Sequence, residues 1–213
     1  MTPSSRPARS SLLSAQVQSY ALALTITFLA LLLAAGAIAS ERDENAIGRL
    51  RRGLISMGEL VSAKVALAAV VALALGLTIA VVFGVIVEAG GVAGGEPWQR
   101  LPLLAAGLLV AGAALGALGT LLGALARETR TASLVAVLVV MPVVFLGLVP
   151  RDALAFAYWV SEALPFAHAV RWFGAALYDA SPWRTLGEQT AWLLGIGAVL
   201  WGLARISMRR LAA

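Results

Sequence analysis

The amino-acid sequence is dominated by long runs of apolar residues with few or no charges. The first uncharged run extends from Tyr20 to Ser40 and the second from Val65 to Val87. A helix needs about 20 residues to cross the hydrocarbon core of a membrane, and both runs reach that length. The runs that are long enough, or nearly so, are 20–40, 65–87, 101–126, 131–149 and 189–206. The sequence therefore predicts a membrane protein built from transmembrane helices.

The composition agrees with this prediction and excludes several other classes of protein. Hydrophobic residues make up 61% of the chain, charged residues only 13%, and the mean hydropathy is +0.90, whereas a soluble chain carries about a quarter charged residues. The absence of cysteine excludes a thiolate metal site, and a single histidine excludes a multi-histidine site within the chain. The net charge of +5 comes from short basic clusters between apolar runs, which set membrane orientation and do not indicate nucleic-acid binding.

Residues 150–182 do not fit a simple transmembrane span. Two apolar stretches, 153–160 and 166–177, are separated by polar residues and Pro165, and neither is long enough to cross the membrane. They predict two short helices that enter one leaflet and return, which requires protein or water to cover their broken backbone.

The predicted fold is an all-α, polytopic membrane helix bundle of five transmembrane helices plus this re-entrant helical segment. It forms a single domain, 1–213, that starts with a polar N-terminal stub, 1–19. The third and fourth spans form a hairpin, because the turn 127–130 is too charged to remain in lipid. Proline at position 142 predicts a kink in the fourth span.

The distribution of basic residues predicts the orientation, because short cytoplasmic loops are enriched in lysine and arginine. Five spans place the loop 41–63 and the C-terminus on one side, together with ten of the sixteen basic residues. A sixth full span over 153–177 would divide them about eight to seven and put Arg171 in the bilayer. The favoured topology places the bundle in the plasma membrane, with the loop and the C-terminus on the cytoplasmic side.

The start of the chain has a second interpretation, as a signal peptide. Ala37-Ile38-Ala39 before Ser40 has the small residues of a signal-peptidase site. The apolar run is longer than a signal h-region of about 7–15 residues, and cleavage would leave the most basic loop on the outer side. A span is therefore favoured, whereas a mature N-terminus at Ser40 would support the signal peptide.

The loop 41–63 carries most of the functional information in the sequence. Seven charges fall within its first twelve residues, and each would cost roughly 2.5–3.5 kcal/mol at mid-membrane, so the loop lies at the surface. Its apolar residues recur at helical spacing, and arginines occupy the other face of the same predicted helix. The apolar positions are Ile47, Leu50, Leu54 and Val61, and the arginines are Arg49 and Arg52.

Gly53 is expected to end this short helix, and Ser56-Met57-Gly58-Glu59 has the spacing of a capping box that starts a new one. The residues alone leave two interpretations of the amphipathic segment open. It rests among lipid headgroups, where each arginine gains about 1 kcal/mol from anionic lipid, or it docks on a cytoplasmic partner.

The order of residues in this loop resembles that of a known family, the type-2 ABC-transporter permeases, which are the membrane subunits of ATP-driven exporters. The residues that match the family's cytoplasmic loop in order and register are Glu41-Arg42, Glu44, Arg49-Leu50, Ser56, Glu59-Leu60 and Lys64. The departures are Asn45-Ala46 for a Gly-Thr pair, Leu54 for a proline and Ala63 for a glycine. Weaker matches follow at 145–150, 164–166 and 169–170. Family members usually have six spans, and the chain resembles them from their second span onward, as if the first span were lacking.

The resemblance implies a transport machine with several subunits. Lys64, the only lysine, does not belong to a glycine-rich phosphate loop, so ATP and Mg are expected on a separate cytoplasmic ABC ATPase and no cofactor on this chain. A second permease chain is expected in a homodimer or heterodimer, surrounded by membrane lipid. The residues expected to couple to the ATPase are Glu41, Arg42, Glu44, Ile47, Arg49, Leu50, Arg52, Leu54, Ser56 and Glu59.

Polar residues outside the loop are candidates for a substrate path or gate. They are Glu88, Glu162, His168 and Arg171. The alternative is a solvated carboxylate at position 88 and a satisfied polar cluster formed by the other three. Four glycines in the third span favour close helix packing, within the chain or between subunits; they are Gly112, Gly116, Gly119 and Gly123.

Two other functional classes compete with the exporter. A membrane-embedded hydrolase would need a nucleophile and an activating base, but no G-x-S-x-G-like turn accompanies His168, so no catalytic residue is predicted. A non-transporting membrane scaffold or immunity-type subunit derived from such a permease remains the alternative. A neighbouring gene for a phosphate-loop ATPase would favour the exporter.

Overall fold

The computed structural model describes residues 6–43, 56–89, 97–126, 128–148 and 155–211. In these parts of the chain, all regular structure is α-helical, which confirms the predicted fold class. The helices are α1 (Arg6–Asp43), α3 (Met57–Ala89), α4 (Pro97–Leu125), α5 (Thr129–Leu148), α6 (Ala155–Glu162), α7 (Pro165–Tyr178) and α8 (Trp183–Leu211).

Four of the five predicted spans are long and apolar enough to cross a membrane. Their membrane-compatible segments are Val17–Arg42, Met57–Val85, Trp98–Leu125 and Trp183–Arg209. The remaining predicted span corresponds to α5, whose apolar part, Arg130–Phe145, is shorter. This helix continues past Pro142. The chain is therefore a multi-pass helical membrane protein.

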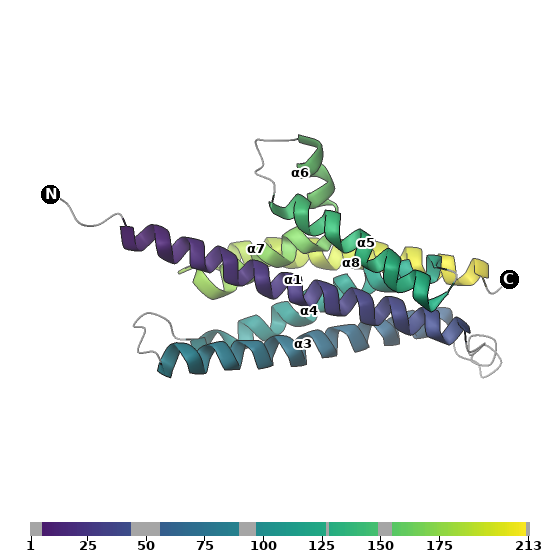
Figure 1. Ribbon diagram of the computed structural model, residues 1–213, viewed down its shortest axis with the longest axis horizontal. Helices are drawn as coiled ribbons and strands as arrows, with labels where there is room; N and C mark the ends of the chain where they lie inside the picture. The colour runs from purple at the N-terminus through teal and green to yellow at the C-terminus, as the bar shows by residue number, and fades with distance from the viewer. Residues whose placement is uncertain (1–5, 44–55, 90–96, 127, 149–154, 212–213) are drawn as a thin grey trace.

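The long helices run alongside one another, and α6 projects to one side at the end of α5 (Figure 1). Helices α1 and α4 form the centre of the bundle, because each packs against α3 and α7 as well as against the other. About half of the apolar window is buried in α1 (50%) and α4 (56%), compared with 22% in α3 and 17% in α8. The outer faces of α3 and α8 are therefore available to lipid.

The glycines of α4 explain how closely the central helices approach. A Cβ atom at Gly112 or Gly116 would lie 2.7 Å from the Cβ of an alanine on α3. A Cβ at Gly119 or Gly123 would lie 2.7 Å or 2.5 Å from a backbone carbonyl oxygen of α1. These contacts confirm that the small residues pack within the chain, because its own α1 and α3 fill the faces that a second subunit would need.

Local sequence signals place several helix ends. Ser56 and Glu59 form the predicted capping box: the Ser56 N–H donates to Glu59 Oε2 at 2.7 Å, and the Glu59 N–H donates to Ser56 Oγ at 3.2 Å. Pro165 opens α7 and separates it from α6, so the predicted pair of short helices is present. At the start of the chain, the polar segment is helical from Arg6 and continuous with the first span.

Candidate functional site

Four of the predicted coupling residues are described, and they fall at one end of the bundle, which we call the loop end: the end at which α1 finishes and α3 begins. Glu41 and Arg42 lie in the last turn of α1, and Ser56 and Glu59 form the capping box of α3. The other predicted coupling residues lie outside the described residues, and their role stays a prediction; they are Glu44, Ile47, Arg49, Leu50, Arg52 and Leu54.

Glu41 connects the end of α1 to the start of α3. Its carboxylate forms an ion pair with the ammonium group of Lys64, and both side chains are only 19% exposed. An ion pair that is shielded from water is screened less by salt than a fully exposed one. The pair therefore holds two helices together where the loop leaves and re-enters the bundle.

Arg42 connects the end of α1 to the end of α4. Its guanidinium donates one hydrogen bond to the carbonyl oxygen of Ala126 and a second, of 2.9 Å, to the carbonyl oxygen of Ala124. The last carbonyls of a helix have no partner within it, and a cation near them also favours the helix dipole. Arg42 thus caps α4 from a neighbouring helix.

Helix α8 joins the same end of the bundle. The indole N–H of Trp201 donates to Ser62 Oγ of α3 at 3.0 Å, and the Arg205 guanidinium lies 5.5 Å from the Trp201 ring centroid, a cation–π contact. A separate apolar cluster brings together residues of α1, α3, α4 and α8; its buried members are Ile38, Leu60, Val61, Ala124, Ala204 and Met208. The end of α8 therefore lies on the same side of the bundle as the loop.

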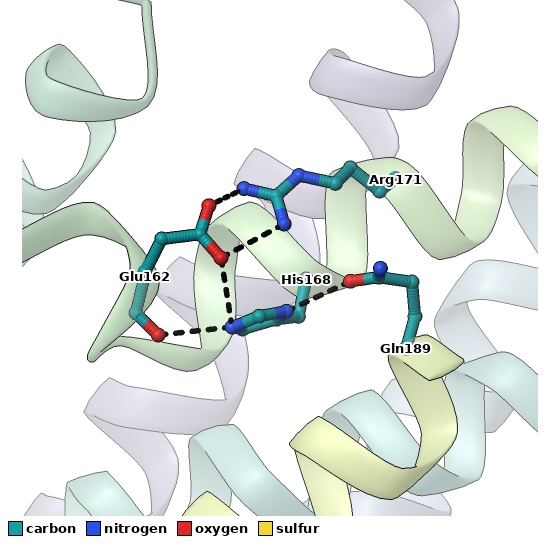
Figure 2. Close-up of polar contacts among 4 residues, drawn as sticks. All are labelled: Glu162, His168, Arg171 and Gln189. Atoms are coloured by element: carbon teal, nitrogen blue, oxygen red, sulfur yellow. Dashed lines mark hydrogen bonds and ion pairs between the residues drawn. The ribbon is translucent and has the colours of Figure 1, made fainter. Parts of the chain in front are cut away.

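The second group of predicted residues gathers around His168 (Figure 2). Glu162 ends α6, and its carboxylate forms an ion pair with Arg171 of α7, with one hydrogen bond of 3.1 Å. His168 precedes Arg171 by three residues on α7 and is completely buried. Its Nε2 lies 2.9 Å from the backbone carbonyl oxygen of Glu162, and its Nδ1 lies 2.7 Å from Oε1 of Gln189 on α8. The cluster thus joins α6, α7 and α8.

The surroundings of His168 favour its neutral form. Burial lowers the pKa of His168, against a smaller opposing effect of the hydrogen bond to Gln189. A neutral imidazole has a single N–H. Both partner atoms are acceptors, so the neutral ring donates either from Nδ1 to Gln189 Oε1 or from Nε2 to the Glu162 carbonyl oxygen. The Trp192 ring stacks on the imidazole, with ring centroids 5.3 Å apart.

Further contacts hold α7 against the bundle at the end opposite the loop end. The Arg100 guanidinium donates to the carbonyl oxygens of Ala176 at 3.0 Å and Asp179 at 2.8 Å, and so caps the C-terminal end of α7. The Trp172 indole N–H donates to Thr190 Oγ1 of α8 at 2.9 Å. A Cβ atom at Gly107 of α4 would lie 2.2 Å from the Trp172 ring, so only glycine leaves room for that side chain.

The structure brings together three of the four predicted gate residues, but it does not describe the side chain of Glu88, which lies near the end of α3. Sequence reasoning missed Gln189, Arg100 and the intramolecular partners of Arg42, because those contacts join separate helices. Among the described residues, no three His, Asp or Glu side chains gather as a metal site would require.

The fold and these sites define a class: a polytopic helical membrane protein in which charged side chains tie the end of α1 to α3 and α4. Comparison with known proteins identifies the family. The family model described as "ABC-2 type transporter" matches residues 5–178, and the chain belongs to this family of membrane transport components.

Curated relatives agree with this assignment. The chain is 26% identical over 190 residues to the inner membrane transport permease YhhJ of Escherichia coli (strain K12) and to the protein of the same name from Shigella flexneri. Each alignment covers 87% of this chain and 49% of the relative. The chain therefore spans about half the length of the curated relatives it matches.

Proposed function

We propose that this chain is the permease subunit of an ATP-driven exporter, which forms the translocation path and couples to a separate cytoplasmic ATPase. Family membership supports the transport role. The observation that carries the coupling role is the bracing at the loop end, where Glu41 and Arg42 tie the last turn of α1 to α3 and α4. A loop anchored in this way transmits movement of a bound partner to the helices of the bundle.

The proposed assembly contains two permease chains and two ATPases in the plasma membrane. ATP and Mg belong to the ATPase, because the chain has no glycine-rich phosphate loop. The segment around Asp43–Gly53 docks on the ATPase, and nucleotide binding there shifts the balance between two arrangements of the bundle. Glu162, His168 and Arg171 act in this assembly by fixing α6 and α7 on α8, at the border of the path.

The orientation of the loop is testable by thiol labelling, because the chain contains no cysteine. We expect a membrane-impermeant maleimide to label an Asn45→Cys variant only after the membrane is permeabilised, since ten of the sixteen basic residues lie on that side. A Ser181→Cys variant, exposed between α7 and α8, serves as the control and should react in intact cells. The reverse pattern would contradict the proposed topology.

The docking role is testable by co-purification from native membranes. We expect an ABC ATPase to accompany the unmodified chain and to be lost from a Leu50→Glu variant, because a carboxylate placed on the apolar stripe of the loop cannot be desolvated in a partner's cleft. A Gln99→Glu variant adds the same charge at an exposed position near the start of α4, at the end of the bundle opposite the loop end. This variant should retain the ATPase. Equal recovery with Leu50→Glu would refute docking, and no ATPase in any sample would favour the scaffold function.

A further inference from the structure

We infer that Glu41, Arg42 and Lys64 are positioning residues, which transmit loop movement by binding the bundle and do not touch the ATPase. This inference rests on the proposed function and specifies how the coupling works. The three side chains are called the clasp below. The family resemblance accounts for Glu41 and Arg42 as part of the coupling loop, whereas the structure assigns each of them a partner within the same chain.

The first argument is that most polar groups of the clasp already have partners within the chain. Glu41 Oε1 is paired with the Lys64 ammonium, both side chains are largely shielded from solvent, and Glu41 Oε2 is buried without a hydrogen-bond partner. Both terminal nitrogens of Arg42 donate to carbonyl oxygens at the end of α4. A partner that bound these groups would first have to break those interactions and leave the helix carbonyls unpaired.

The second argument is the connectivity of the clasp. The loop continues from Asp43, directly after Arg42, and returns through Ser56 to α3. Without the clasp, a push on the loop would reach α1 and α3 only through the covalent chain. With it, the same force also acts directly on the end of α4, because Arg42 holds the final carbonyls of that helix in addition to the packing of α1 on Gly119 and Gly123. The apolar cluster beneath the clasp joins α8 to the same unit.

The test exchanges the charges of Glu41 and Lys64 in the full chain, reconstituted in lipid nanodiscs. Nitroxide labels are attached at Ser40→Cys and Ala63→Cys, near the facing ends of α1 and α3. The dipolar coupling between the labels reports the separation of these helix ends. We expect Glu41→Lys and Lys64→Glu each to weaken and broaden the coupling, and the double variant to restore it. Restoration follows because the swapped charges attract each other. Unchanged coupling in the single variants, or no restoration in the double variant, would overturn the inference.

The functional arm uses the complex with whatever ATPase co-purifies. Labels at Gln99→Cys on two permease chains report movement at the other end of α4 when ATP, Mg and vanadate are added. We expect the nucleotide-dependent shift to shrink in an Arg42→Gln variant, whose shorter side chain does not reach the final carbonyls of α4, although ATPase recovery stays equal. An unchanged shift in Arg42→Gln would overturn the inference. Loss of ATPase recovery in the Glu41→Lys variant without rescue would show direct contact and overturn the inference. If no ATPase is ever recovered, the proposed function fails, while the nanodisc measurement still decides whether the clasp exists.

Discussion

Replacing Gly123 with alanine is expected to destabilise the folded bundle strongly. The added Cβ would lie 2.5 Å from the carbonyl oxygen of Ala35 and 3.0 Å from its Cα, and both atoms belong to the backbone of α1. A backbone cannot rotate aside as a side chain can, so the two central helices must separate. Overpacking of this kind costs typically about 1–3 kcal/mol. The midpoint of thermal unfolding of the purified chain in detergent should fall measurably.

The control for this prediction is the same substitution at a glycine with free space. A Cβ at Gly195 of α8 meets no atom within 4 Å. Alanine favours the helix over glycine by up to about 1 kcal/mol, so Gly195→Ala should leave the midpoint unchanged or raise it. If Gly123→Ala and Gly195→Ala unfold at the same temperature, the close contact between α4 and α1 is not a determinant of stability.

Replacing His168 with leucine is expected to destabilise the attachment of α7. Leucine fills much of the same space but offers no hydrogen bond to the buried side chain of Gln189 or to the carbonyl oxygen of Glu162. Each buried polar group left without its partner costs about 1–3 kcal/mol. Protease accessibility of the segment between α6 and α7 should therefore rise, and the thermal midpoint should fall.

A double-mutant cycle separates this hydrogen bond from the packing of the leucine itself. Gln189→Leu alone should also be destabilising, because it leaves the imidazole Nδ1 without its partner. The variant with both leucines should lose less stability than the sum of the single variants, since neither side of the bond then remains unpaired. Simple additivity would mean that the bond between His168 and Gln189 contributes nothing to the fold.

The sequence predicts the architecture well because lipid imposes simple rules on it. A spanning helix must satisfy its own backbone and must be apolar over a fixed length, so hydropathy and length identify α1, α3, α4 and α8. The start of α3 was equally predictable, since a capping box depends on residues three positions apart. Pro165 marked the start of α7 for a similarly local reason.

The contacts that build the candidate sites could not be predicted in this way. The sequence shows that the glycines at 112, 116, 119 and 123 lie on one face of α4, but only the structure shows that the first two pack on α3 and the last two on α1. Arg42 and Arg100 both cap the end of a neighbouring helix, and nothing in the local sequence distinguishes them from ordinary surface arginines. Gln189 reaches His168 across two helices that lie side by side only in the folded chain.

The length of α1 has a mechanical consequence. Its 38 residues make a rod about 57 Å long, at a rise of about 1.5 Å per residue, whereas the hydrocarbon core is only about 30 Å thick. Rocking such a rod about its midpoint by about 10° displaces each tip by about 5 Å, by simple trigonometry on that length. A modest tilt imposed at the end of α1 next to Arg42 therefore moves the other end of the same helix, beyond the opposite membrane surface. This requires no change in the helix's own backbone conformation.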